Sequence, residues 1–140
     1  MDKSAAKIQF ERYIIRKIDF QLNPDFSADP DKRELEIDIN LQHTLALDSQ
    51  GKKAELSLLC GLSKDQGPFS LAVEIVGFFA YDGDLDDEQK QLLLTTNGSA
   101  ILFPYLRAAI SMVTMLSGIP AFVLPTFNIA QLIRSAKSSD

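Results

Sequence analysis

The sequence predicts an α+β fold, in which a four-stranded antiparallel sheet carries helices packed on one face, as a single domain over residues 1–140. Two observations lead to this class. Apolar and polar residues alternate with a period of two in the N-terminal part of the chain, and longer apolar segments follow in the C-terminal part. Strands therefore precede helices, an order typical of helices gathered on one face of an antiparallel sheet.

The first strand is expected over residues 8–22. From Ile18 to Leu22 apolar and polar residues alternate, and the many β-branched residues favour a strand. A helix is the competing interpretation, because Ile14, Ile18 and Leu22 are spaced by four residues. The alternation breaks at residues 13–15, which predicts a β-bulge there.

The clearest strand pattern covers residues 34–47, where one face is apolar and the other polar, as in a half-buried antiparallel strand. Residues 54–62 and 69–81 continue the alternation as the third and fourth strands. From 75 to 81 both faces become apolar, so we expect this end of the fourth strand to be covered on both sides. The apolar face of the second strand carries Leu35, Ile37, Ile39, Leu41, Leu45 and Leu47.

Two short helices are expected around a longer one. Asp86 can cap the first, which is expected to run through Leu94 and to stop at Gly98. The second covers residues 129–136, near the end of the chain.

The main helix is expected to begin near Phe103 or Pro104, because proline is tolerated in a first helical turn, and to end at Gly118. This helix has little polar face, whereas one sheet can cover only one of its sides. A homo-oligomer would bury the remainder; a central helix in a compact monomer is the alternative. The expected interface residues are Tyr105, Ala109, Met112, Val113 and Leu116.

Residues 101–107 read Ile-Leu-Phe-Pro-Tyr-Leu-Arg and resemble the run with which the SecB family of export chaperones enters its long helix. The proline-marked segment 118–128 and Gly77-Phe78-Phe79 are also similar to that family. The resemblance implies an ATP-independent holdase that binds unfolded preproteins, needs no cofactor and is not an enzyme. It also implies protomers that pair through their sheets and dimers that stack through the long helices, which favours a tetramer.

Family positions that bind unfolded clients match seven residues here. For each of them ordinary core packing is the competing interpretation, since alternation by itself marks a core face. The implied client-binding residues are Leu35, Ile37, Ile39, Phe122, Leu124, Phe127 and Leu132.

The family also binds the translocase motor SecA through an acidic patch. Two positions that align with this patch, Lys17 and Gln21, are not acidic here, which argues against a SecA-type partner. Asp19, Glu36 and Glu74 are the candidate substitutes on the polar face of the sheet.

Composition excludes several classes of function. The net charge of −5 and the lack of a Lys/Arg cluster predict no nucleic-acid partner. A single cysteine, Cys60, and an N-terminus without an apolar signal core predict a cytoplasmic protein. Residues 99–117 are mostly apolar, but Arg107 and Pro104 within them argue against an integral membrane segment.

Catalytic chemistry has little support in the sequence. If Leu47 pairs with Ala54, His43 faces Leu58 and Cys60 lies diagonally across, but no third group orients a Cys–His dyad. No catalytic residue and no metal site is predicted. Two alternatives to an export chaperone stay open: a small-molecule or lipid-binding α+β domain, and a SecB-like chaperone of a toxin–antitoxin system.

Overall fold

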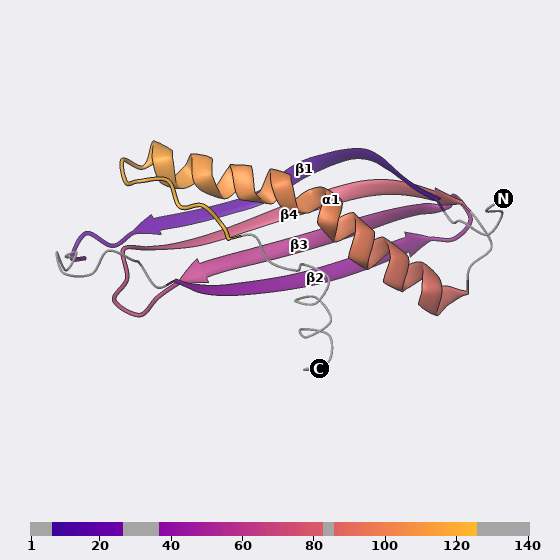
Figure 1. The fold of residues 1–140 in the computed structure, drawn as a ribbon, viewed down its shortest axis with the longest axis horizontal. Coiled ribbons are helices and arrows are strands. Elements are labelled where there is room, and N and C mark those ends of the chain that lie inside the picture. The colour runs from indigo at the N-terminus through magenta and orange to yellow at the C-terminus, as the bar shows by residue number, and fades with distance from the viewer. Residues whose placement is uncertain (1–6, 27–36, 83–85, 126–140) are drawn as a thin grey trace.

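The computed structural model describes residues 7–26, 37–82 and 86–125. They form one four-stranded antiparallel sheet, in the order β1-β4-β3-β2, with a long helix crossing one face of it (Figure 1). The predicted fold class is confirmed, and β1 and β2 are the two edges of the sheet. The elements are β1 (Lys7–Leu22), β2 (Asp38–Asp48), β3 (Lys53–Ser63), β4 (Phe69–Asp82) and α1 (Asp87–Leu116).

Strands β2 and β3 pair in the register that the sequence analysis considered. Leu47 pairs with Ala54, and His43 pairs with Leu58. The apolar residues of β3 and β4 that face α1 are buried, because the helix covers them, while most polar residues on the opposite face stay exposed. The beginning of the predicted second strand, residues 34–36, lies outside the described residues.

Strand β1 is a strand and not the competing helix. Its pairing with β4 shifts register twice, between Phe10 and Arg12 and between Ile15 and Lys17. The sequence predicted one irregularity at residues 13–15, and the two shifts flank that segment. Each shift leaves one residue of β1, Glu11 or Arg16, without a paired residue on β4. Such bulges increase the local twist of a strand.

The core lies between the inner face of the sheet and one stripe of α1. Residues of this stripe recur every four positions, so each lies next to the following one and the stripe winds slowly around the helix as the helix crosses the sheet. Val76, on the outer face of β4, is also buried, as its two-sided apolar run predicts. Nearby, the Arg12 guanidinium covers the Phe78 ring at 4.0 Å. The stripe of α1 consists of Leu94, Gly98, Leu102, Leu106, Ile110 and Thr114.

The prediction that a short first helix stops at Gly98 is wrong, because α1 runs unbroken past it. Gly98 is buried where the helix crosses the sheet. A Cβ atom there would lie 2.8 Å from Cδ2 of Leu56 and 3.3 Å from the Phe79 ring. Gly98 therefore allows close packing of helix and sheet. The predicted start of this region is confirmed, since Asp86 caps α1 by accepting the N–H of Gln89 at 2.8 Å.

The prediction that the main helix begins at Phe103 or Pro104 is also wrong, because both lie inside α1. Proline has no N–H to donate to the carbonyl of Ala100, which removes one helical hydrogen bond. Ala100 and Pro104 are both exposed, so water can solvate that carbonyl. Figure 1 shows α1 bending near the middle of its length, as proline commonly causes.

Helix α1 ends where the sequence predicts. Ser117 is the C-cap, and Gly118 follows with φ +93°, a left-handed conformation that glycine adopts without strain. The chain then turns back as a segment without regular secondary structure, residues 119–125, here called the crossover segment (Figure 1). The predicted helix at 129–136 lies outside the described residues.

Helix α1 is long and apolar enough to cross a membrane by length and composition, with a mean hydropathy of 1.5 in its most apolar window. The core helix of a folded domain has the same properties, and α1 packs against all four strands. The lack of an integral membrane segment stays a prediction.

Candidate functional site

The crossover segment is attached to the last turns of α1 through the backbone of one residue. The N–H of Phe122 donates to Oγ1 of Thr114 at 2.8 Å, and Oγ of Ser111 donates to the carbonyl of Phe122 at 3.0 Å. Thr114 is fully buried, and its hydroxyl also donates to the carbonyl of Ile110 or Ser111. Both backbone groups of Phe122 are thereby satisfied away from any strand.

Side chains alternate along the crossover segment. Phe122 is half-buried and its ring packs edge-on against Phe69 of β4, with 6.1 Å between centroids. Val123 points outward and is exposed, whereas Leu124 is 0% exposed and belongs to the core. Two implied client-binding residues thus lie on one segment, but in this structure Leu124 has no surface to offer a client.

The implied client-binding residues Ile39, on β2, and Ile37, directly before it, lie at the edge of the sheet. Ile37 and Ile39 are half-buried and pack against the core cluster. Because β2 is an edge strand, it has no neighbour on its other side within the described residues, 7–26, 37–82 and 86–125. Three further implied positions, Leu35, Phe127 and Leu132, lie outside the described residues.

The interface residues expected on α1 lie on the side of the helix away from the core stripe or beside it. Leu116 is 76% exposed and Met112 is 56% exposed, and Tyr105 is also exposed. Ala109 and Val113 are half-buried against the core cluster. The sheet therefore leaves a large part of this apolar helix uncovered, which is the condition on which the oligomer prediction depends.

A second group of exposed apolar side chains, on edge strand β1, was missed by the sequence interpretation. Ile18 is 52% exposed, and Leu22 and Tyr13 are exposed as well, although all three face the helix side of the sheet. The alternation marked their face but could not show that β1 would be an edge. Tyr13 stacks on Tyr105 of α1 with 4.4 Å between ring centroids.

These two groups meet through the stacked tyrosines. Figure 1 shows the C-terminal half of α1 running along β1 in the same direction, and Tyr13 and Tyr105 join the two elements. We call this region the α1–β1 apolar surface. It consists of Tyr13, Ile18, Leu22, Tyr105, Met112 and Leu116.

The outer face of the sheet carries the predicted acidic residues that are described. Asp19 and Glu74 lie on it, paired with Ala72 and Lys17 respectively, and Glu36 lies outside the described residues. The guanidinium of Arg16 binds Glu74 through two hydrogen bonds, of 2.8 and 3.2 Å.

Arg16 and Lys17 offset much of the negative charge that Asp19 and Glu74 give to the outer face of the sheet. The hydrogen bonds from Arg16 hold the pKa of the Glu74 carboxyl below its ordinary value, with smaller contributions from the charges of Arg16 and Lys17. In return, the hydrogen bond with Glu74 raises the pKa of Arg16. Glu74 is thus ionised but already paired, so it contributes little net negative potential to a partner.

The geometry around His43 and Cys60 does not make a reactive centre. His43 pairs with Leu58, and Cys60 pairs with Leu41 in the next position of the same face, as predicted. Cys60 is buried, and burial raises its pKa to about 11, so the reactive thiolate is scarce at neutral pH. Among the described residues no group of three or more His, Cys, Asp or Glu could hold a metal ion.

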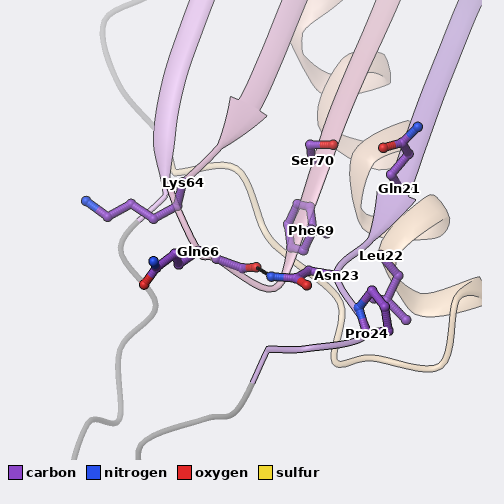
Figure 2. A pocket seen from close by; sticks show the side chains of 9 residues that line it. Gln21, Leu22, Asn23, Pro24, Lys64, Gln66, Phe69 and Ser70 are labelled. Carbon is purple, nitrogen blue, oxygen red and sulfur yellow. Dashed lines mark hydrogen bonds between the residues drawn. The ribbon is translucent and has the colours of Figure 1, made fainter.

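A hollow of about 340 Å³ lies at the end of the sheet where β1 and the β3–β4 turn meet (Figure 2). Its floor includes a hydrogen bond of 2.8 Å from the side-chain amide of Asn23 to the carbonyl of Gly67. The lining brings together side-chain amides, the hydroxyl of Ser70, the side chain of Lys64 and apolar groups. The hollow lies between the end of β1 and the β3–β4 turn, and its lining does not pair a nucleophile with a base. The lining residues are Gln21, Leu22, Asn23, Pro24, Lys64, Gln66, Gly67, Phe69 and Ser70.

The fold and its uncovered apolar surfaces are typical of a protein that binds other polypeptide chains. The sequence model of the SecB family, described as preprotein translocase subunit SecB, matches residues 2–140. This chain therefore belongs to the SecB family, whose members are chaperones. It is 31% identical over 132 residues to an uncharacterized protein of Methanocaldococcus jannaschii, MJ0357, covering 90% of this chain and 82% of that protein.

The solved structures with a similar fold include the following two. One is the Mycobacterium tuberculosis SecB-like chaperone Rv1957, in complex with a ChAD peptide from the antitoxin HigA1. It has a TM-score of 0.72 and 17% identity, covering 86% of this chain and 90% of that one. The other is a Streptococcus agalactiae protein of unknown function, with a TM-score of 0.55, 15% identity, and coverage of 87% and 99%.

Proposed function

We propose that this protein is an ATP-independent holdase that binds extended, unfolded segments of other proteins through apolar surface. The observation that carries the proposal is the half-buried apolar edge of β2, which has no strand beside it among the described residues, in a chain of the SecB family. The α1–β1 apolar surface supports the assembly that the proposal includes. An apolar surface of this kind recognises many sequences, because contact area and not a fixed set of hydrogen bonds supplies the affinity. Exposed apolar patches commonly mark such interaction sites.

The two apolar regions have different roles in this proposal. The α1–β1 apolar surface joins copies of the chain, and a tetramer is the expected assembly. The edge of β2, with Ile37 and Ile39, and the region around the crossover segment remain for clients. Edge strands offer unpaired N–H and C=O groups to an extended chain, which adds affinity that does not depend on client sequence. We place the protein in the cytoplasm, where unfolded chains occur before export.

The test combines two measurements on the purified full-length chain. Light scattering should give a mass of about 62 kDa, the value for four 15.5 kDa chains. The same sample should suppress the aggregation of a chemically unfolded test protein without ATP. A monomer that leaves aggregation unchanged would refute both parts of the proposal.

A paired substitution separates client binding from folding. Ile37→Ser together with Ile39→Ser should weaken suppression of aggregation and leave the mass unchanged, because both residues lie at an edge and are only half-buried. The exposed Thr44→Ser on the opposite face of β2 is the matched control. If the double variant unfolds instead, these residues are structural and the client site lies elsewhere.

The biological route has two candidates. The first is delivery of preproteins for export to a SecA-type motor. Its weak point is the outer face, where Arg16 and Lys17 offset Asp19 and Glu74. The second is chaperoning an antitoxin, which the fold similarity to Rv1957 with its antitoxin peptide favours. Binding of purified SecA, compared with binding of an antitoxin encoded beside this gene if one is present, would distinguish the two.

A further inference from the structure

The crossover segment occupies its position in the way that an unfolded client would. Residues 119–125 contain no charged side chain and have no regular secondary structure. Among the described residues, the hydrogen bonds recorded for this segment are the two that Ser111 and Thr114 make with the backbone of Phe122. An apolar, irregular segment held through its backbone has the properties of a bound unfolded chain.

The two hydroxyl contacts do not depend on which residue provides the backbone. Thr114 accepts an N–H and Ser111 donates to a C=O, and every residue except proline has both groups. The pair of hydroxyls can therefore hold the backbone of a client residue as well as that of Phe122. Thr114 keeps its own donor satisfied by carbonyls within α1, so the acceptor position needs no rearrangement.

Side-chain packing adds a pattern to this backbone contact. The ring of Phe122 lies against Phe69, which itself packs on Phe20 of β1 with 5.8 Å between ring centroids. Two residues later Leu124 fills a fully enclosed place in the core, while Val123 points to solvent. The position thus accepts an aromatic side chain at one residue and a branched aliphatic side chain two residues further on.

We propose that the crossover segment is an internal substitute for a client. It occupies a site for extended segments that carry an aromatic residue at position i and a branched aliphatic residue at position i+2. Client binding displaces it, and the client backbone takes over the hydroxyls of Ser111 and Thr114. This inference rests on the proposed holdase function and names the class of segment that the holdase selects.

Phe122 and Leu124 then have the opposite role to the one that the family resemblance implies. The family resemblance implies that Phe122 and Leu124 contact the client, so their truncation should weaken client binding. If they instead occupy the client position, their truncation removes a competitor and strengthens binding. A tethered segment competes at a high effective concentration, so its removal has a large effect on apparent affinity.

The experiment measures binding of a fluorescent peptide copy of residues 119–125 to the full-length chain and to Phe122→Ala/Leu124→Ala. We expect the double variant to bind the peptide at least about tenfold more tightly than the natural chain. The two truncated side chains no longer bury apolar surface, so the crossover segment competes less well with the peptide. Adding Thr114→Val to the double variant should reverse most of this gain. A peptide with Ser in place of its Phe and Leu is the control and should bind neither protein.

Weaker peptide binding by a folded double variant would overturn the inference. Aggregation suppression by the natural chain, measured separately, would in that case leave the holdase proposal standing. If the natural chain does not suppress aggregation, and neither the natural chain nor the double variant binds the peptide, both proposals fail together.

A second measurement covers the case in which the double variant does not fold. Hydrogen exchange at the Phe122 amide of the natural chain should be slow, because this N–H is hydrogen-bonded to Thr114. The exchange should become faster when the peptide copy of residues 119–125 or an unfolded test protein binds. An unchanged exchange rate at Phe122 under saturating unfolded protein would show that the segment stays in place, and would overturn the inference without the variant.

Discussion

The hydroxyl of Thr114 accepts the backbone N–H of Phe122 at 2.8 Å, and through this contact the end of α1 fixes the chain that follows it. Thr114 belongs to the core stripe of the helix and is completely buried. A polar residue in that position is stable because its donor and its acceptor are both used. The contact converts the end of the helix into an anchor for the crossover segment.

Thr114→Val should lower the free energy of unfolding by about 1–3 kcal/mol, because it leaves the N–H of Phe122 without a buried acceptor. The measurement is denaturant unfolding followed by circular dichroism. Thr114→Ser keeps the hydroxyl and should recover most of the loss. Equal stability of the Val and Ser variants would show that the hydrogen bond contributes nothing.

Gly77→Ala should destabilise the fold by about 1–3 kcal/mol through overpacking. A Cβ atom at Gly77 would lie 2.7 Å from Cδ2 of Leu102 and 2.8 Å from the Phe79 ring, and both side chains are buried on all sides. Thermal unfolding is the measurement. Gly61→Ala is the matched control on β3, since the nearest atom to its Cβ would be 4.0 Å away. A neutral Gly77→Ala would mean that α1 can move off β4 without cost.

The ion pair of Arg16 and Glu74 should make stability depend on pH in acid. The pKa of Glu74 is lowered in the folded state, chiefly by its hydrogen bond with Arg16. Its contribution is therefore complete above the ordinary glutamate pKa and is lost as the pH falls through the lowered folded-state value. The stability gap between the natural chain and Glu74→Gln should be small, because the pair is on the surface, and should close in acid.

Melting temperatures of the natural chain and of Glu74→Gln between neutral pH and pH 3 would measure this gap. Arg16→Ala should show the same loss of pH dependence as Glu74→Gln, since either change removes the same pair. A gap that stays constant down to the most acidic samples would contradict the assignment.

Met112→Lys together with Leu116→Lys should reduce the mass in solution without unfolding the chain. Both side chains are exposed on α1, so the protomer loses no core contact, whereas charges placed on the α1–β1 apolar surface would repel a second copy. Light scattering measures the mass and circular dichroism checks the fold. The same change at Val123, which is exposed on the crossover segment, is a control for added charge. An unchanged oligomer would place the interface elsewhere.

Much of the sheet follows from the sequence. The alternation predicts β2 and β3, and the pairing of His43 with Leu58 follows once Leu47 pairs with Ala54, as it does in the structure. The end of α1 at Gly118 is equally local, because only glycine adopts its positive φ without strain. Period and turn chemistry are properties of neighbouring residues, so these features can be predicted before the fold is known.

The tertiary structure decided what those local patterns leave open. Gly98 and Pro104 are local signals for a helix boundary, but burial of the stripe from Leu94 to Thr114 against the sheet outweighs both and keeps α1 continuous. The local cost of one glycine and one exposed proline is smaller than the gain from packing a long helix on four strands.

Exposure along the chain was likewise decided by the fold. The same apolar alternation that buries Leu71 leaves Ile18 half uncovered, because β1 is an edge strand while β4 is central. Leu124 and Val123 are similar in sequence terms, yet one fills the core and the other faces solvent. The sequence by itself determined which residues are apolar and which face of each strand they share, but not the two register shifts of β1 against β4. Only the tertiary structure determined which apolar side chains remain available to another chain, because availability depends on what lies across from each residue.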